Sequence, residues 1–277
     1  MKKFLIFIFL LVFFISNFAL ENFFTLNEND SSIKFYPVYE KGFLNVFSHK
    51  IQFGKDCTYF DYVKYGNQNN LYPFERFSID MVIKNKHVVT FLYQPLTLKT
   101  QAYLFDTLVV DSVIFPKGSD MDFLYSFDFY RISYMYNIFT FNRSRIFFGL
   151  SFQLRNAFIS FSDGENILTN SNIGPVPIFK LKTESEIGSK FYIENEFDGF
   201  YASGKYITGS KNDFVGAIFD LSSRFVYNLN SFSNLFLNLR YLGGGAEGTS
   251  KDETSRYDGY VKNWLHTFSL SFGIKLK

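Results

Sequence analysis

From Phe43 onward, hydrophobic and polar side chains alternate with a period of two over stretches of about ten to sixteen residues. This alternation predicts β-strands, because successive side chains of a strand point to opposite faces of the sheet. Turn-forming residues separate the stretches. We predict ten strands, at approximately 43–54, 74–84, 87–98, 123–141, 145–161, 177–187, 191–202, 214–229, 234–243 and 261–276.

The connections between these strands alternate between short and long. The short ones are 85–86, 142–144, 188–190 and 230–233, and the long ones are 55–73, 99–122, 162–176, 203–213 and 244–260. Short turns at one end and long loops at the other are typical of bacterial outer-membrane barrels, whose turns are periplasmic. An even strand number places both termini in the periplasm. The sequence therefore predicts an all-β fold, a transmembrane antiparallel up-and-down β-barrel over 43–277.

The more regular strands each have one apolar face. In 145–161 the even positions from Ile146 to Leu154 are apolar, whereas the odd positions from Gly149 to Arg155 are small or polar. A soluble β-sandwich would show such a face in its core, but strands of this length favour a face turned toward lipid. The run 109–114 is either an extra hairpin in the second long loop or part of a twelve-stranded alternative.

The composition supports the barrel and limits its partners. Aromatic residues make up 21% of the chain, with 39 Phe and 19 Tyr, which favours strands and interfacial belts. Loss of Lys2 and Lys3 from the 28 basic residues would leave 26, equal to the 26 acidic residues, so we expect no nucleic-acid partner. The single cysteine, Cys57, allows no internal disulfide, and we expect a monomer.

The N-terminus resembles an export signal. Lys2 and Lys3 precede an unbroken apolar stretch over 4–15, followed by the more polar 16–19. A stretch of about twelve apolar residues is too short for a membrane span but suits the h-region of a secretory signal peptide. We predict a signal peptide over 1–19 and an N-terminal periplasmic segment over 20–42, and we place the mature chain in the outer membrane.

Over essentially the whole mature length, the chain resembles bacterial outer-membrane β-barrels as a class. The stretches 240–248 and 263–268 resemble segments of an uncharacterised barrel family with no assigned activity. The last strand is similar to the C-terminal insertion signal of such proteins, although it ends in Lys277 rather than an aromatic residue. The resemblance implies contact with outer-membrane lipids and with the barrel assembly machinery.

Charged residues on the predicted lumen faces form the main candidate site. A hairpin centre at Ser189 places Lys180 opposite Asp198 and Lys182 opposite Glu196. A centre at 230–232 places Arg224 near Asn238 and Ser222 near Arg240, with Asp220 one step along. A centre at Arg143 places Arg131 opposite Arg155. The cluster is read either as an anion-selective or substrate-guiding constriction, or as a closed, ion-paired interior, which we favour for a barrel this narrow. The predicted cluster comprises Arg131, Arg155, Arg224, Arg240, Asp220, Lys180, Lys182, Glu196 and Asp198.

Evidence for other chemistry is weak. Trp264 and His266 share the outward face of the last strand, where they suit an interfacial anchor. No spacing predicts a metal site or a catalytic residue, and the glycine-rich run 243–248 is not followed by a helix, so we expect no cofactor. Passive transport or structural maintenance is the working hypothesis. The alternatives are an outer-membrane enzyme, such as a lipid A hydrolase or an omptin-like protease, and a surface adhesin.

Overall fold

The structure is a computed structural model that describes residues 33–203, 213–249 and 258–277. The predicted signal peptide over 1–19 lies outside the described residues, as do residues 20–32. No helix within the described ranges is both long enough and apolar enough to cross a membrane.

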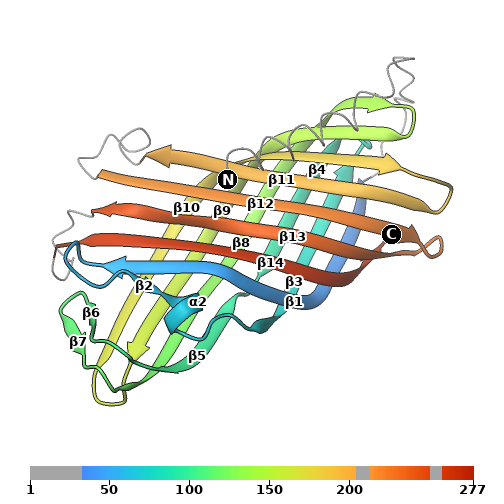
Figure 1. Cartoon of the computed structure of the whole chain (residues 1–277). Helices are drawn as coiled ribbons and strands as arrows, with labels where there is room; N and C mark the ends of the chain where they lie inside the picture. The colour runs from blue at the N-terminus through green and yellow to red at the C-terminus, as the bar shows by residue number, and fades with distance from the viewer. Residues whose placement is uncertain (1–32, 204–212, 250–257) are drawn as a thin grey trace.

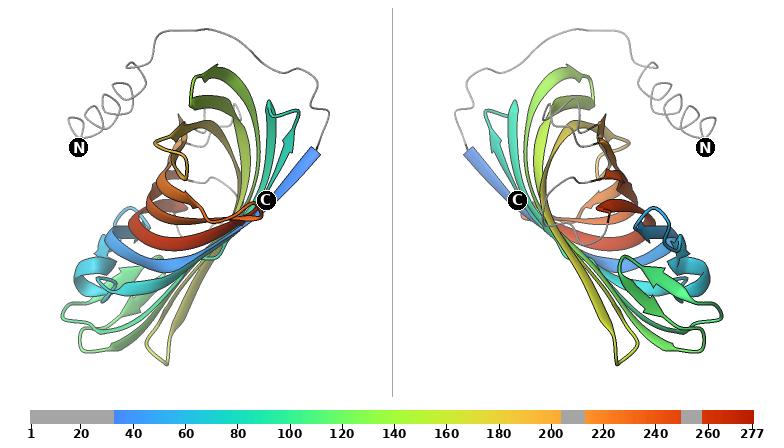
Figure 2. Two further views of the ribbon diagram at one scale, coloured as in Figure 1. Left: turned by 90° about the vertical axis from the view of Figure 1, so that its right-hand side faces the viewer. Right: turned by 90° about the vertical axis from the view of Figure 1, so that its left-hand side faces the viewer.

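The strands form one closed antiparallel barrel of ten strands, as predicted (Figures 1 and 2). Each strand pairs with the next along the chain, and β14 returns to pair with β1 over Val38 to Phe53. The first five wall positions are β1 (Ile33–Phe53), β3 (Leu71–Ile83), β4 (His87–Gln94) with β5 (Thr97–Tyr103), β8 (Asp120–Phe141) and β9 (Ser144–Ser162). The other five are β10 (Ile167–Glu186), β11 (Phe191–Ser203), β12 (Asp213–Asn228), β13 (Ser233–Thr249) and β14 (Tyr260–Leu276).

The twelve-stranded alternative is wrong. Its extra hairpin exists as β6 (Leu108–Val110) and β7 (Val113–Phe115). These two strands pair only with each other and are not part of the wall. The predicted strand 87–98 is instead split into β4 and β5, which both pair with β8. Pro95 lies at the break, where its missing N–H cannot join the ladder.

Two strands start earlier than their sequences suggest. β1 begins at Ile33 rather than Phe43, so residues 33–42 of the predicted periplasmic segment belong to the wall. Pro37 is tolerated because β14 pairs with β1 only from Val38 onward. β10 begins at Ile167, so the predicted loop over 162–176 is wrong and only residues 163–166 connect β9 to β10. The polar run from Thr169 to Gly174 resembles a loop but pairs fully with β9.

The two ends of the barrel differ. At the turn end, strands are joined by residues 84–86, 142–143, 187–190 and 229–232. In the first of these turns Lys84 and Asn85 both have positive φ values, of 52° each, as the central residues of a type I′ turn do, and the Lys86 N–H donates to the Ile83 carbonyl at 3.1 Å. The opposite end, called the loop end below, bears β2 (Phe60–Asp61), α2 (Tyr62–Tyr65), β6 and β7.

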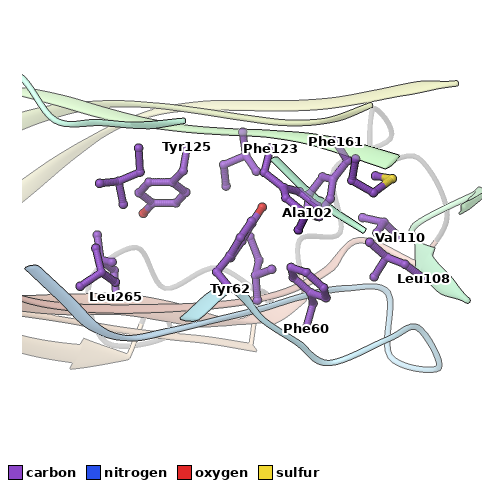
Figure 3. Packing of buried hydrophobic residues seen from close by; sticks show 14 of the residues in the cluster. Phe60, Tyr62, Ala102, Leu108, Val110, Phe123, Tyr125, Phe161 and Leu265 are labelled. Carbon is purple, nitrogen blue, oxygen red and sulfur yellow. The ribbon is translucent and has the colours of Figure 1, made fainter. Parts of the chain in front are cut away.

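An apolar cap occupies part of the lumen at the loop end. Figure 3 shows side chains from β2, α2 and β6 meeting inward-facing residues of β8, β9 and β14. Tyr62 and Phe161 are fully buried, and Tyr62 packs edge-on against Phe123 with ring centroids 5.4 Å apart. Apolar burial of this kind stabilises the loops against the wall. The cap includes Phe60, Tyr62, Ala102, Leu108, Val110, Phe115, Phe123, Tyr125, Phe161 and Leu265.

Cys57 offers a probe of the cap. It lies between β1 and β2, is 9% exposed, and its thiol donates a hydrogen bond to the Asp111 carbonyl at 3.4 Å. Burial raises the pKa of the thiol, so less of the reactive thiolate forms at a given pH. We expect slow maleimide labelling of the folded protein, accelerated at least ~10-fold by Phe115→Ala, which removes a fully buried ring of the cap.

The matched control is Phe105→Ala, because Phe105 is 71% exposed. Mass spectrometry of labelled protein over time measures the rates, with urea-unfolded protein as the reference for full reactivity. Equal rates in the two variants would show that Phe115 does not hold the cap over Cys57.

Candidate functional site: the charged lumen

Side chains alternate strictly between the two faces of the wall. On β9 the outward residues Phe148, Leu150 and Phe152 are exposed, whereas the inward Gly149, Ser151 and Gln153 are buried. The same division holds on β13 and on β14. The outer face of the barrel is therefore apolar, the arrangement that a lipid environment selects, and most of its buried polar side chains face the lumen. Two small apolar clusters, which include Phe147 and Phe236, lie among them toward the turn end.

The centre of the lumen is held by two arginines. Arg131 from β8 forms ion pairs with Asp198 from β11 and, at 3.0 Å, with Asp220 from β12. Its guanidinium also donates to Gln153 Oε1. Arg240 from β13 shares the Asp220 carboxylate. Because β8 and β12 are not neighbours in the wall, these contacts cross the interior.

A second group surrounds Arg224 of β12. Its guanidinium pairs with Glu40 of β1, and with Glu194 at 2.6 Å and Glu196 at 3.4 Å, both on β11. Glu40 is fully buried and also accepts hydrogen bonds from Asn238 at 2.9 Å and Ser271 at 3.1 Å. One carboxylate thus links β1 to β12, β13 and β14.

Three lysines complete the set. Lys180 lies 2.7 Å from Glu196 and 3.1 Å from Asp198, and Lys182 lies 2.9 Å from Glu194. Lys275 of β14 pairs with Asp80 of β3 at 3.2 Å, and Asp80 also accepts from Thr90. A lysine at each of these positions neutralises a carboxylate on a neighbouring or facing strand.

Thirteen ion pairs join these residues into one connected group, called the lumen network below. Its side chains are at most 15% exposed, and its seven basic and seven acidic members balance each other. Buried charges require such pairing. The half-exposed Arg145 contacts the edge of the network through Glu184. The members are Arg76, Arg131, Lys180, Lys182, Arg224, Arg240, Lys275, Glu40, Asp80, Glu184, Glu194, Glu196, Asp198 and Asp220.

Most of the predicted pairings match the structure. Lys180 lies opposite Asp198 and Lys182 opposite Glu196, while Arg224 lies opposite Asn238 and Ser222 opposite Arg240. The pairing of Arg131 with Arg155 is wrong, since Arg131 lies opposite Gln153. A β-bulge between Asn137 and Phe139, together with a turn of only two residues, shifts the β8–β9 register by two positions.

Arg155 consequently stands apart from the network. It faces the lumen closer to the loop end, opposite Phe129 and Gly174, and has no ion pair among the described residues. A Cβ atom at Gly174 would lie 3.3 Å from Arg155 Nε, so the glycine leaves room for this side chain.

Several network members lie outside the cluster that the sequence predicts. Glu40 lay in a segment predicted to precede the barrel, and Lys275 follows the alternation of β14 but has partners only on distant strands. Arg76 and Asp80 lie on the inward face of β3. The period-two pattern of β3 could have identified these two, whereas the partners of Glu40 and Lys275 become visible only when the sheet closes.

Residues offered for other roles are also placed. Trp264 and His266 point outward on β14, and His266 Nδ1 lies 2.8 Å from the Tyr241 hydroxyl, so the anchor role stays a prediction. The other two histidines contact Gln68 (His49) and Tyr134 (His87). In the described part of the chain, no group of His, Cys, Asp or Glu side chains suits a metal ion. Residues 243–248 continue β13.

Comparison with solved structures identifies the architecture. The outer membrane protease OmpT from Escherichia coli superposes with a TM-score of 0.50 at 7% identity, covering 92% of this chain and 99% of that one. The fold is that of an outer-membrane β-barrel protein. The barrel is also matched by Neisserial surface protein A (TM-score 0.33, 12% identity, 89% and 99% covered) and by a Pseudomonas aeruginosa FadL homologue (TM-score 0.38, 6% identity, 89% and 90% covered). The sequence matches no protein-family model and no curated protein.

Removing one member of the network should destabilise the barrel strongly. Glu40→Ala would leave the buried Arg224, Asn238 and Ser271 without their shared acceptor, and we expect a loss of about 3–5 kcal/mol in the free energy of unfolding. Lys262→Ala is the control, because Lys262 and Glu247 form a partly exposed pair worth no more than about 1 kcal/mol. Urea unfolding of protein refolded into lipid vesicles measures both. Similar losses in the two variants would contradict a structural role for Glu40.

Proposed function

We propose that the protein is a closed barrel that does not conduct ions. It serves the outer membrane as a structural component and presents its loop end at the cell surface. The observation that carries this proposal is the lumen network, which crosses the interior from β8 to β12 and from β3 to β11. An open pore needs a continuous wet path. Balanced ion pairs between side chains at most 15% exposed favour a filled lumen.

The apolar cap supports the same proposal independently. It places buried rings in the lumen beside β8 and β9 at the loop end, whereas the lumen network crosses the interior closer to the turn end. A solute that passed through the barrel would have to displace the network as well as pass the cap. Apolar constrictions also oppose ion passage because ions cannot shed water there.

Planar-bilayer recording tests closure. We expect no discrete conductance from the wild-type protein. A variant in which both layers are opened should conduct, and it carries Arg131→Ala, Arg224→Ala, Arg240→Ala and Phe115→Ala. It should prefer cations, because three basic network members are lost and no acidic ones.

The controls are the triple arginine variant and Phe115→Ala alone, each of which keeps one layer and should stay silent. Insertion is verified by the mobility difference between heated and unheated protein on gels. Discrete steps from inserted wild-type protein would contradict the proposal.

A second candidate function is binding of an anionic solute from the loop end, and Arg155 is the observation that favours it. This guanidinium is half-buried and lacks an acidic partner among the described residues. The inward-facing Asn172 is exposed, which indicates that solvent reaches the inner wall of β10 beside it. A buried cation reachable by solvent suits a carboxylate or phosphate group.

Inorganic phosphate provides the probe. At constant ionic strength, we expect phosphate to raise the Tm of the wild-type protein relative to chloride, and Arg155→Gln to abolish the increase. The control, Arg145→Gln, removes a half-exposed arginine that already has a carboxylate partner, and should keep the increase. An equal increase in all three proteins would refute the site, since it would reflect a general effect of the salt.

A further inference from the structure

One ion pair lies on the outer face of the barrel, within the apolar belt. Lys41 of β1 and Glu75 of β3 are direct register partners, with Nζ 3.2 Å from the carboxylate. Their side chains are 67% and 45% exposed, in contrast to the lumen network. Both residues sit at outward positions of the alternation, on the same face as Phe43 and Phe77.

The pair lies among outward apolar residues and not at the end of a strand. Along β1, Lys41 lies eight residues from Ile33 at the turn end and six residues from the outward Phe47. Glu75 lies four residues from the start of β3 at Leu71, and Phe272, the register partner of Lys41 on β14, lies four residues from the end of that strand at Leu276. A transmembrane strand needs about 9–11 residues to cross the hydrocarbon, so we place the pair within the span.

Lipid cannot satisfy these two groups. An ammonium group has three donors and a carboxylate has about four acceptor sites, whereas the described contacts are the ion pair itself and a hydrogen bond from the Tyr39 hydroxyl to Glu75 at 3.4 Å. Both side chains are exposed on the outer face, so no other described group occupies the remaining sites. Outward charges near the bilayer midplane are destabilising in barrels, most of all lysine.

We propose that a second copy of this chain covers this face, forming a two-fold symmetric dimer in the membrane. Lys41 pairs with Glu75 of the partner subunit, and Glu75 pairs with Lys41 of the partner subunit. The outer faces of β1 and β3 form the contact, with Phe43 and Phe77 packing around the four charges. This assembly differs from the monomer expected from the sequence.

The charge arrangement favours a second copy over an unrelated partner. Adjacent positive and negative groups form a self-complementary patch, since a two-fold axis along the membrane normal brings each charge against its opposite. A single copy already carries every group that the contact needs. The aromatic residues around the charges can pack against the same residues of a second copy.

Reciprocal charge reversal tests the dimer. Lys41→Glu gives a protomer with two acidic groups, and Glu75→Lys gives one with two basic groups, so each variant repels itself but attracts the other. Two differently tagged copies are co-expressed and one tag is purified from nanodiscs. We expect recovery of wild type with wild type, loss of at least tenfold for either variant with itself, and restored recovery when the two variants are mixed.

Two controls separate dimerisation from folding. The double variant K41E/E75K keeps opposite charges in each protomer and should dimerise as the wild type does. The outward pair between Lys262 and Glu247 is of the same cross-strand type but lies near the loop end, so K262E and E247K should leave recovery unchanged. The heat-dependent gel shift verifies that every variant is folded.

Either of two results would overturn the proposal. The first is the absence of co-purification for wild-type protein that is folded in nanodiscs. The second is recovery for the mixed variants no greater than for each variant with itself, because that pattern would show that Lys41 and Glu75 act only within one chain.

Discussion

The pairing of β14 with β1 is the constraint on which the rest of the molecule depends. In lipid, each unpaired backbone N–H or C=O group costs several kcal/mol, so an open sheet edge is not tolerated. The contact between the two terminal strands removes both edges along most of the length of β1. Closure also forces ten inward faces into one narrow lumen. Most charges on those faces then pair with a group from another strand, and Arg155 is the exception described above.

The interior meets this requirement differently at its two ends. In the turn-end half, acidic and basic side chains neutralise one another across the lumen, because they come from strands that are not neighbours in the wall. At the loop end, two connecting segments fold inward and bury aromatic rings against the wall. Gln94 and Gln153 are also fully buried, as is a small apolar cluster around Phe129. The barrel is thus filled by its own wall and loops.

Much of the architecture was predictable because a strand has a short, strict period. Strand number and hairpin order depend on contacts between strands that follow each other in sequence. The same holds for the register that places Lys180 opposite Asp198 and Lys182 opposite Glu196. The failures involve information that a local pattern lacks. The bulge near Ile138 moved Arg155 away from Arg131, and the charged start of β1 concealed Glu40, whose partners lie about two hundred residues later. Polar residues over 169–174 resembled a loop although β9 supplies their partners.

Glu40 has a further consequence for how the chain reaches its final state. Its hydrogen-bond and ion-pair partners come from β12, β13 and β14, although its register partner on β3 is the basic Arg76. The final set of contacts around this early carboxylate therefore forms only when the last strands have been added. Closure of the sheet thus also completes the polar surroundings of a residue that was placed at its beginning.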